Sequence, residues 1–178
     1  MGLIQVDTFT VTSAVANVII GGGSSGSSSN NFAINTNDVY QLVYRDLFMS
    51  NDGAGAHIRL TVSGSADTSS NYDRAYSAIY ANQNIYNTAN ANAAQFNGSG
   101  QGTTLAESQQ GMLYLYNFAD ASEHSFVSIE IIHTTETPEY YAMMGGFVLT
   151  NNQATDGIQF VANSGNIASG TFTLYKVI

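Results

Sequence analysis

The segment Ala56-His57-Ile58-Arg59-Leu60-Thr61-Val62-Ser63 decides the fold class. Its apolar residues stand at every second position, and polar residues fill the positions between them. Successive side chains of a strand point to opposite faces, so this alternation predicts a strand with one buried face and one solvated face.

Comparable segments recur along the chain. Phe126–His133 alternates less cleanly, and Thr171–Ile178 is rich in strand-forming residues. Other strand candidates are Ile4–Val11, Ala14–Ile20, Val39–Met49, Tyr72–Tyr80, Met112–Phe118, Gly146–Thr150 and Gly157–Ala162. Turn-forming Asn, Asp and Gly residues lie between several of them. We therefore predict an all-β fold, an antiparallel β-sandwich of jelly-roll-like type, with about 8–11 strands and little or no helix.

Residues 82–96 depart from this pattern. Asn82–Phe96 holds several Ala residues, which favour a helix, but also many Asn residues, which do not. This segment is expected to be a loop, or a short helix at best.

The length of 178 residues suits one domain. Residues 1–31 comprise N-terminal strands, or an arm, and a Gly/Ser-rich stretch, and residues 32–178 hold the predicted sandwich. Gly21–Asn31 is either a long surface loop or a linker. Met1–Ile20 is too short to fold alone, and would pair with the sheet or with a neighbouring subunit.

The charge balance excludes several partners. Four Lys and Arg residues stand against thirteen Asp and Glu residues, which gives a net charge of −9, and only 10% of residues are charged. Four scattered cations cannot form the basic patch that nucleic acid or an anionic membrane requires. Because the chain has no cysteine, we expect no disulfide, no cysteine-ligated zinc and no thiol nucleophile.

Two motif matches fall in the glycine-rich stretch. Gly22–Gly26 matches G-x-S-x-G, and Gly21, Gly23 and Gly26 match G-x-G-x-x-G. Both motifs function at a strand–turn–helix junction, and the serine-rich residues that follow cannot open such a helix. We interpret both matches as products of low complexity.

Other candidate chemistry is equally unspecific. The three histidines are His57, His124 and His133, and His57 is expected on the solvated face of its strand. Glu130 could be one of a glycosidase carboxylate pair, but the alternation places it on the polar face. Ser65–Asp73 offers oxygen ligands for calcium, although Asx turns account for the same residues. We therefore assign no catalytic, cofactor-binding or metal-binding residue, and expect no cofactor and no enzyme activity.

Tyrosine is abundant, with eleven Tyr and no Trp. Tyr114, Tyr116 and Phe118 alternate on one expected strand, and Tyr72, Tyr76 and Tyr80 follow another. Most are expected in the core, although exposed aromatic faces can also stack on sugars or fill interfaces. Met112–Phe118 has apolar residues on both faces, which is typical of a central strand or of one covered by a neighbouring subunit.

The C-terminal string Asp156–Phe160 followed by Ser164–Lys176 resembles the ending of small virion structural proteins of tailed bacteriophages, particularly marine and cyanobacterial ones. Weaker similarities extend the resemblance over about Val39 to Ile178. They lie in Asp38–Tyr44, Ile58–Gly64, Asp67–Asp73, Gly111–Asn117 and Ser122–Phe126.

This resemblance implies an all-β domain on the outer surface of the virion, assembled in the host cytoplasm, with no catalytic residues. Within this family, the short length of the chain favours a capsid decoration (cement) or head-fibre protein bound to the major capsid protein. The alternative is a tail-fibre receptor-binding module that recognises host glycans. A homo-oligomer, with a trimer favoured, is expected because symmetric shells commonly carry closed oligomers.

Overall fold

The computed structural model describes residues 2–79, 84–96, 100–135, 137 and 139–178. These residues form thirteen strands and two single-turn 3-10 helices, η1 (Gly23–Ser25) and η2 (Leu105–Glu107). The predicted all-β sandwich is confirmed. Two of the thirteen strands have only two residues each, so eleven longer strands remain.

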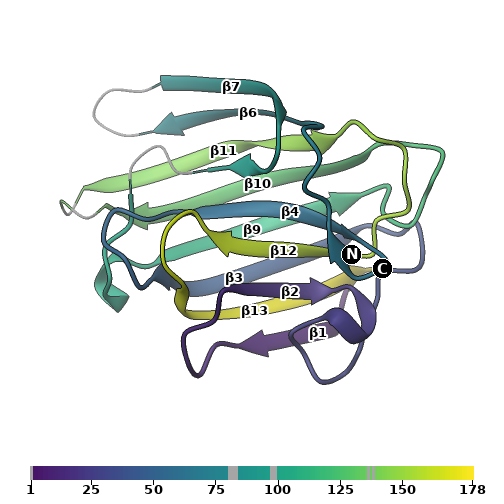
Figure 1. Cartoon of the computed structure of the whole chain (residues 1–178), viewed down its shortest axis with the longest axis horizontal. Coiled ribbons are helices and arrows are strands. Elements are labelled where there is room, and N and C mark those ends of the chain that lie inside the picture. Colours follow the sequence, from purple (N-terminus) through teal and green to yellow (C-terminus); the bar gives the residue numbers. More distant parts are fainter. Residues whose placement is uncertain (1, 80–83, 97–99, 136, 138) are drawn as a thin grey trace.

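The strands form two antiparallel sheets (Figure 1). The long sheet runs, in spatial order, β1 (Leu3–Thr10), β13 (Ile167–Val177), β3 (Tyr40–Met49), β9 (Gln109–Tyr116), β10 (Ser125–Thr134), β11 (Tyr140–Leu149), β6 (Tyr72–Ile79) and β7 (Asn84–Ala91). The short sheet runs β2 (Asn17–Gly21), β12 (Gly157–Ala162), β4 (Ala56–Val62) and β5 (Ser65–Ala66), and β8 (Ala94–Gln95) also pairs with β4.

The pairing is nested along the chain. β1 pairs with β13, β2 with β12, β3 with β9 and β4 with β8. A doubled-back ribbon of this kind, wrapped into two sheets, gives the jelly-roll-like connectivity. Two hairpins are inserted into it, β6–β7 and β10–β11, and both extend the long sheet beyond β9.

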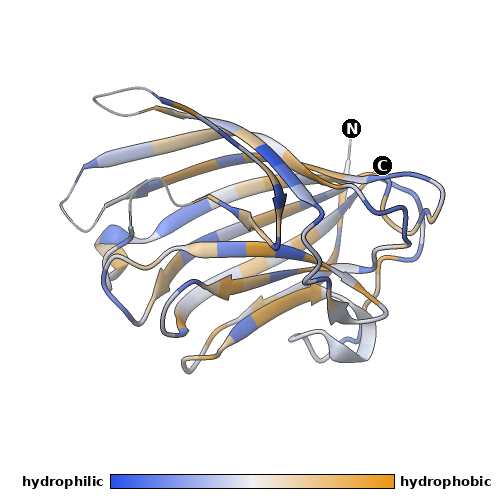
Figure 2. Ribbon diagram, turned by 45° about the horizontal axis from the view of Figure 1, so that its top comes forward, coloured by the Kyte–Doolittle hydropathy of each residue, from blue (hydrophilic) through white to orange (hydrophobic). Residues whose placement is uncertain are grey.

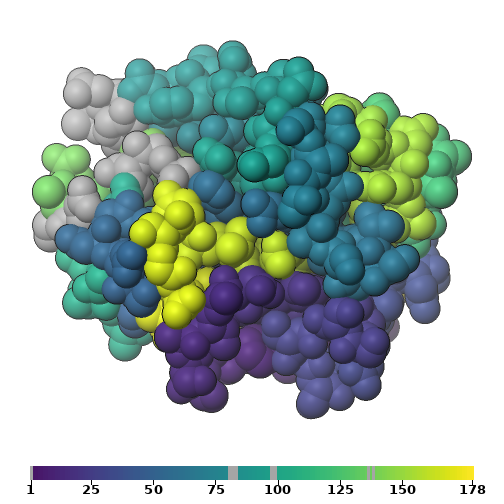
Figure 3. Space-filling model, in the orientation of Figure 1, coloured from purple at the N-terminus to yellow at the C-terminus, as the bar shows by residue number. Residues whose placement is uncertain are grey.

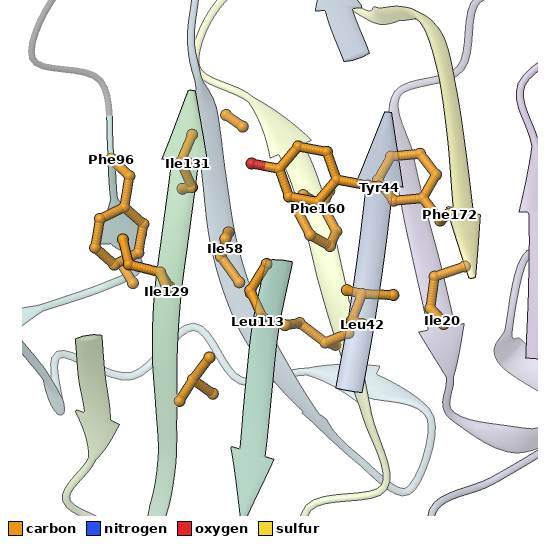
Figure 4. Close-up of a cluster of buried hydrophobic side chains, with 14 of the residues drawn as sticks. Ile20, Leu42, Tyr44, Ile58, Phe96, Leu113, Ile129, Ile131, Phe160 and Phe172 are labelled. Carbon is orange, nitrogen blue, oxygen red and sulfur yellow. The ribbon is translucent and has the colours of Figure 1, made fainter. Parts of the chain in front are cut away.

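The core lies between the two sheets. Leu42, Leu113 and Ile129 of the long sheet and Ile58 and Phe160 of the short sheet are buried there (Figure 4). Each fully buried side chain of this size contributes about 1.5–3 kcal/mol of transfer free energy. Hydrophobic and hydrophilic segments alternate along the strands, as the two-residue period requires (Figure 2).

Aromatic rings join the two layers. Phe160 on β12 lies 4.9 Å from Phe172 on β13 and 5.2 Å from Tyr44 on β3, measured between ring centroids. The Tyr44 hydroxyl donates to Gln109 Oε1 at 2.7 Å, so its one polar atom is paired inside the core. These contacts fix the short sheet over the β13–β3–β9 part of the long one.

The N-terminal residues are built into both layers. β1 is an edge strand of the long sheet and β2 an edge strand of the short one. In Figure 3 the N-terminal segments lie directly against C-terminal ones, in agreement with the β1–β13 and β2–β12 pairs.

The Gly/Ser-rich stretch lies against the sandwich. Ser27 exchanges hydrogen bonds with the backbone of Ile19, and the Asn30 side chain donates to Val6 O at 3.0 Å. Gly22 N–H donates to Asp156 O at 2.8 Å. This stretch therefore connects β2 to β3 as a packed loop.

The prediction for residues 82–96 is wrong for the described part of that segment. Residues 84–91 form β7 and residues 94–95 form β8, where a loop or short helix was expected. Six of the eight β7 residues are exposed. The strand therefore depends on backbone pairing to the edge of β6 rather than on an apolar face, and that pairing overrides the weak strand propensity of Asn.

Candidate functional site

The most distinctive surface is the face of the long sheet that points away from the short sheet, which we call the outer face. On β9, Leu113 and Leu115 point into the core, whereas Met112, Tyr114 and Tyr116 lie on the outer face. β9 is thus the central strand that its two apolar faces predict, but this chain covers only one of them.

The outer face is apolar over five strands. It exposes Val43 on β3, Tyr116 on β9, Phe126 and Ile132 on β10, Tyr140 and Met144 on β11, and Ile79 on β6, with exposed fractions between 36% and 61%. Over β1 and β13 the same face is polar, where Thr8 and Thr10 contact Thr173 and Thr171. Contiguous apolar patches of this extent mark interaction surfaces on soluble proteins.

A hollow of about 510 Å³ opens on the outer face. Its floor consists of the small residues Ser128, Gly146 and Ala75, which are cross-strand neighbours on β10, β11 and β6. Tyr116 and Phe126, themselves neighbours across β9 and β10, form part of its wall. The hollow exists because small side chains lie beside large ones.

Packing requires the glycine in this floor. A Cβ at Gly146 would lie 2.5 Å from Val127 O, and a Cβ at Gly145 would overlap the backbone of Ala75 and Tyr76. A side chain at either position would force strands β10, β11 and β6 apart. The hollow is therefore built into the backbone of the sheet.

A second, smaller hollow of about 320 Å³ lies toward β3. Val43, Met112 and Ile132 line it together with the charged residues Arg45 and Glu130. Glu130 is exposed on the side of β10 that faces away from the core, where the alternation places it.

Charge is sparse on the outer face. The five apolar strands carry five charged residues, with a net charge of −1 against −9 for the chain: Arg45, Asp46, Asp73, Arg74 and Glu130. Arg45 is paired with Asp46 at 2.8 Å, and the Asp73 carboxylate accepts a hydrogen bond from Asn90 N–H at 2.8 Å. The acidity of the protein therefore resides mainly on other surfaces.

Two cations, Arg59 and Arg74, lie near β4. Arg59 donates to Asn92 O at 3.1 Å, and Arg74 lies 5.7 Å from the centre of the Tyr76 ring. Burial and these two guanidinium groups lower the pKa of His57 to about 4. His57 is half-buried, whereas a solvated or hydrogen-bonded surface histidine was expected, and its Nε2 has no hydrogen-bond partner among the described residues.

The other histidines lie elsewhere. His124 contacts the Phe126 ring, and His133 is buried beside Tyr141 with its Nδ1 3.0 Å from Thr134 O. Burial lowers the pKa of His133. Within the described residues no group of three or more His, Asp or Glu side chains is arranged to hold a metal ion.

The segment 65–73, considered as a possible calcium loop, is engaged in hydrogen bonds of its own. Asp67 accepts from the backbone and hydroxyl of Ser69 and from the side chain of Gln153. Asp73 is engaged separately with Asn90. The segment 65–73 thus contains an Asx turn, the interpretation that the sequence favoured over a calcium site.

The G-x-S-x-G match has no elbow around it. Ser24 lies in the three-residue helix η1, and the chain becomes extended at Gly26, where φ is −64° and ψ is 153°. A nucleophile elbow needs a full helix after its turn. The local structure therefore agrees with a chance match.

The tyrosines divide between core and outer face. Tyr72 and Tyr76 are buried, whereas Tyr114 and Tyr116 lie on the outer face, and Tyr80 lies outside the described residues. The sequence placed Phe118 on the same strand face as Tyr114 and Tyr116, but the structure does not. β9 ends at Tyr116, and Asn117 has a φ of +60°. This turn directs Phe118 into the core, where it is fully buried.

The outer face was only partly predictable. The two-sided apolarity of Met112–Phe118 suggested cover by a neighbour, but nothing in sequence indicated that Ser128, Gly146 and Ala75 come together to form a hollow. Their contact depends on the register of β10, β11 and β6.

No family model, curated protein or solved structure matches this chain. Among the described residues, no helix has the length and apolar character needed to span a membrane.

Proposed function

We propose that this chain is a structural protein of the outer surface of a tailed-phage particle, a capsid-decoration or head-fibre subunit that binds the major capsid shell. It acts by docking rather than by catalysis. The observation that carries this proposal is the apolar outer face, with its shallow hollows, on a sandwich whose charge lies elsewhere. The resemblance of the C-terminal string Asp156–Lys176 to virion proteins supplies the particle context.

The surface chemistry suits docking to protein. The hollow over Gly146 is lined mostly by apolar atoms of Tyr116, Phe126 and Val148. Reaction sites instead gather titratable groups with perturbed pKa values in a cleft. His57 and His133, whose pKa values are lowered, do not line this hollow.

The free edge of β1 offers a place for attachment to the shell. Within the part of the chain that the structure describes, β1 pairs with β13 on one side only, and Leu3 and Ile4 are about half exposed, at 48% and 50%. An edge strand can accept an extended segment from another protein through backbone hydrogen bonds. In this proposal the N-terminal strand provides the contact with the capsid.

The location on the particle tests the proposal. Electron microscopy of phage particles that encode this chain, labelled with gold-conjugated antibody to it, should show label distributed over the head. Particles lacking the gene provide the control for antibody specificity. Label confined to tail fibres, or no label on intact particles, would refute the decoration role.

One observation favours the second candidate, a tail-fibre module that recognises glycans. Tyr116 and Phe126 line the same hollow as Asp73 and Arg74, and sugars bind where aromatic faces adjoin hydrogen-bonding groups. On a glycan array, sugar-specific binding that is lost in Phe126→Ala would support this candidate. Absence of binding to host surface glycans would remove it.

A further inference from the structure

We propose that the outer face is a self-association surface, on which the projecting side chains of one copy enter the hollow over Gly146 of a second copy. This inference goes beyond the virion role, because it assigns the outer face to a second copy of the chain and leaves the β1 edge for contact with the capsid. It concerns the purified chain alone, and the reciprocal contact it describes is that of a two-fold dimer, whereas the sequence favoured a trimer.

The extent of the patch fits a subunit contact. Five neighbouring strands spaced about 4.8 Å apart, with side chains at both margins, span roughly 25 Å, and eight residues along a strand span about 27 Å. The projected area is therefore on the order of 650 Å², close to the roughly 800 Å² that each partner contributes to a standard stable interface.

The patch contains both halves of an interlocking contact. Ile132 and Met144 project from it with exposed fractions of 46% and 51%. The hollow lies over Ser128 and Gly146, and Ser128 is four residues from Ile132 on the same strand, or about 13 Å. A second copy can therefore place its projections in the hollow of the first and receive the first copy's projections in return.

The charge distribution favours contact between two copies of the chain through the outer face rather than through their other, more acidic surfaces. Two molecules of net charge −9 repel one another, and the repulsion is least where the facing surfaces carry little charge. The net charge of the patch is −1, with Arg45 and Glu130 of opposite sign around the second hollow.

A hydrogen bond and a ring contact hold the aromatic side chains at the centre of the patch in place. Gln41 donates to the Tyr114 hydroxyl at 2.7 Å, and the Tyr114 and Tyr116 rings stack at 6.4 Å. Side chains held in this way lose little conformational entropy on association. The aromatic stripe of β9 thus forms a preorganised centre for the contact.

Sedimentation velocity of the purified full-length chain tests this inference. The native chain should sediment as a species larger than its 18.9 kDa monomer. Ile132→Glu and Met144→Glu each place a carboxylate on the projecting side, and Ala75→Phe fills the hollow from an exposed position. Each change should weaken association about 30-fold or more, as for loss of an interface hot spot.

Ile178→Glu provides the matched control, because Ile178 is an exposed apolar residue, 65% accessible, beyond the end of β13. It should leave the association unchanged. Far-UV circular dichroism and thermal melting of each variant establish that it is folded. A monomeric native chain, or folded variants that associate like the native chain, would overturn the inference. Neither result would move the antibody label on the particle, so the two proposals fail separately.

Discussion

The carboxylate of Asp7, on β1, accepts a hydrogen bond from the backbone N–H of Gly21, at the end of β2, at 2.9 Å. Its other oxygen accepts from Thr8 N–H at 2.9 Å, and Asp7 is only 2% exposed. β1 and β2 belong to different sheets, so this one side chain joins the two layers where the glycine-rich loop begins.

We predict that Asp7→Ala destabilises the fold by about 1–3 kcal/mol, because the buried N–H of Gly21 loses its acceptor. Urea unfolding provides the measurement. Asp52→Ala removes an equal charge from an exposed turn and should change stability by less than about 0.5 kcal/mol. Equal effects of the two changes would mean that the Asp7–Gly21 contact contributes nothing.

The same contact bears on experiments with the N-terminal segment. Deletion of residues 1–20 removes β1 and most of β2, the edge strands of both sheets. Such a deletion perturbs folding as well as any contact with the capsid. Replacement of the exposed Leu3 and Ile4 by Lys leaves the strand in place and is the cleaner test of attachment through the β1 edge.

Gly111 lies beneath the ring of Tyr44, and a Cβ at this position would overlap that ring. Gly111→Ala should therefore cost about 1–3 kcal/mol through overpacking, and would disturb the hydrogen bond from Tyr44 to Gln109. Thermal unfolding measures the loss. Ala75→Ser, on the exposed side of β6, is a control of similar size and should leave the midpoint nearly unchanged. A Gly111→Ala protein as stable as the native one would show that this part of the core is loosely packed.

Stability should fall as the pH is lowered from about 6.5 to about 4. Burial, Arg59 and Arg74 lower the pKa of His57 from 6.5 to about 4. Between these values the unfolded chain binds a proton that the folded chain does not, so the folded state loses stability as the pH falls. His133, whose pKa burial also lowers, contributes with the same sign.

His57→Gln should flatten this part of the profile, as measured by urea unfolding at a series of pH values. Asp38 does not interfere, because a hydrogen bond from Lys176 lowers its pKa below 3.8, so its contribution is lost only at more acidic pH. An unchanged slope in His57→Gln would contradict the assignment of this window to His57.

Calcium should have no effect on thermal stability. The Asp67 oxygens are already engaged by Ser69 and Gln153, so a metal ion would have to displace existing hydrogen bonds. Melting curves recorded with calcium and with a chelator should coincide. A rise in midpoint with calcium that disappears in Asp67→Asn would instead establish a site in residues 65–73.

The sequence predicted most of the sandwich because alternation directly reports a half-buried strand. Ala56–Ser63 corresponds to β4, and Thr171–Ile178 falls largely within β13. The alternation is broken in β3, where Asp46 has a φ of +58° and a bulge separates Tyr44 from Leu47. This bulge returns Leu47 to the core, which a strict two-residue period does not predict.

Other features could not be predicted because they arise from tertiary pairing. β7 is a polar edge strand that carries no apolar period, and only the edge of β6 defines it. Likewise, Gly146 and Ala75 are 71 positions apart in sequence, yet are paired across β11 and β6. The sequence indicated that β9 is apolar on both faces, whereas the hollow beside it depends on register.

Co-sedimentation of the purified chain with phage particles lacking its gene tests the proposed virion role most directly. We expect the added chain to pellet with the particles and to remain bound at raised salt, because few charges are available to make a salt-sensitive contact. A chain that stays in the supernatant, or that dissociates at moderate ionic strength, would contradict it.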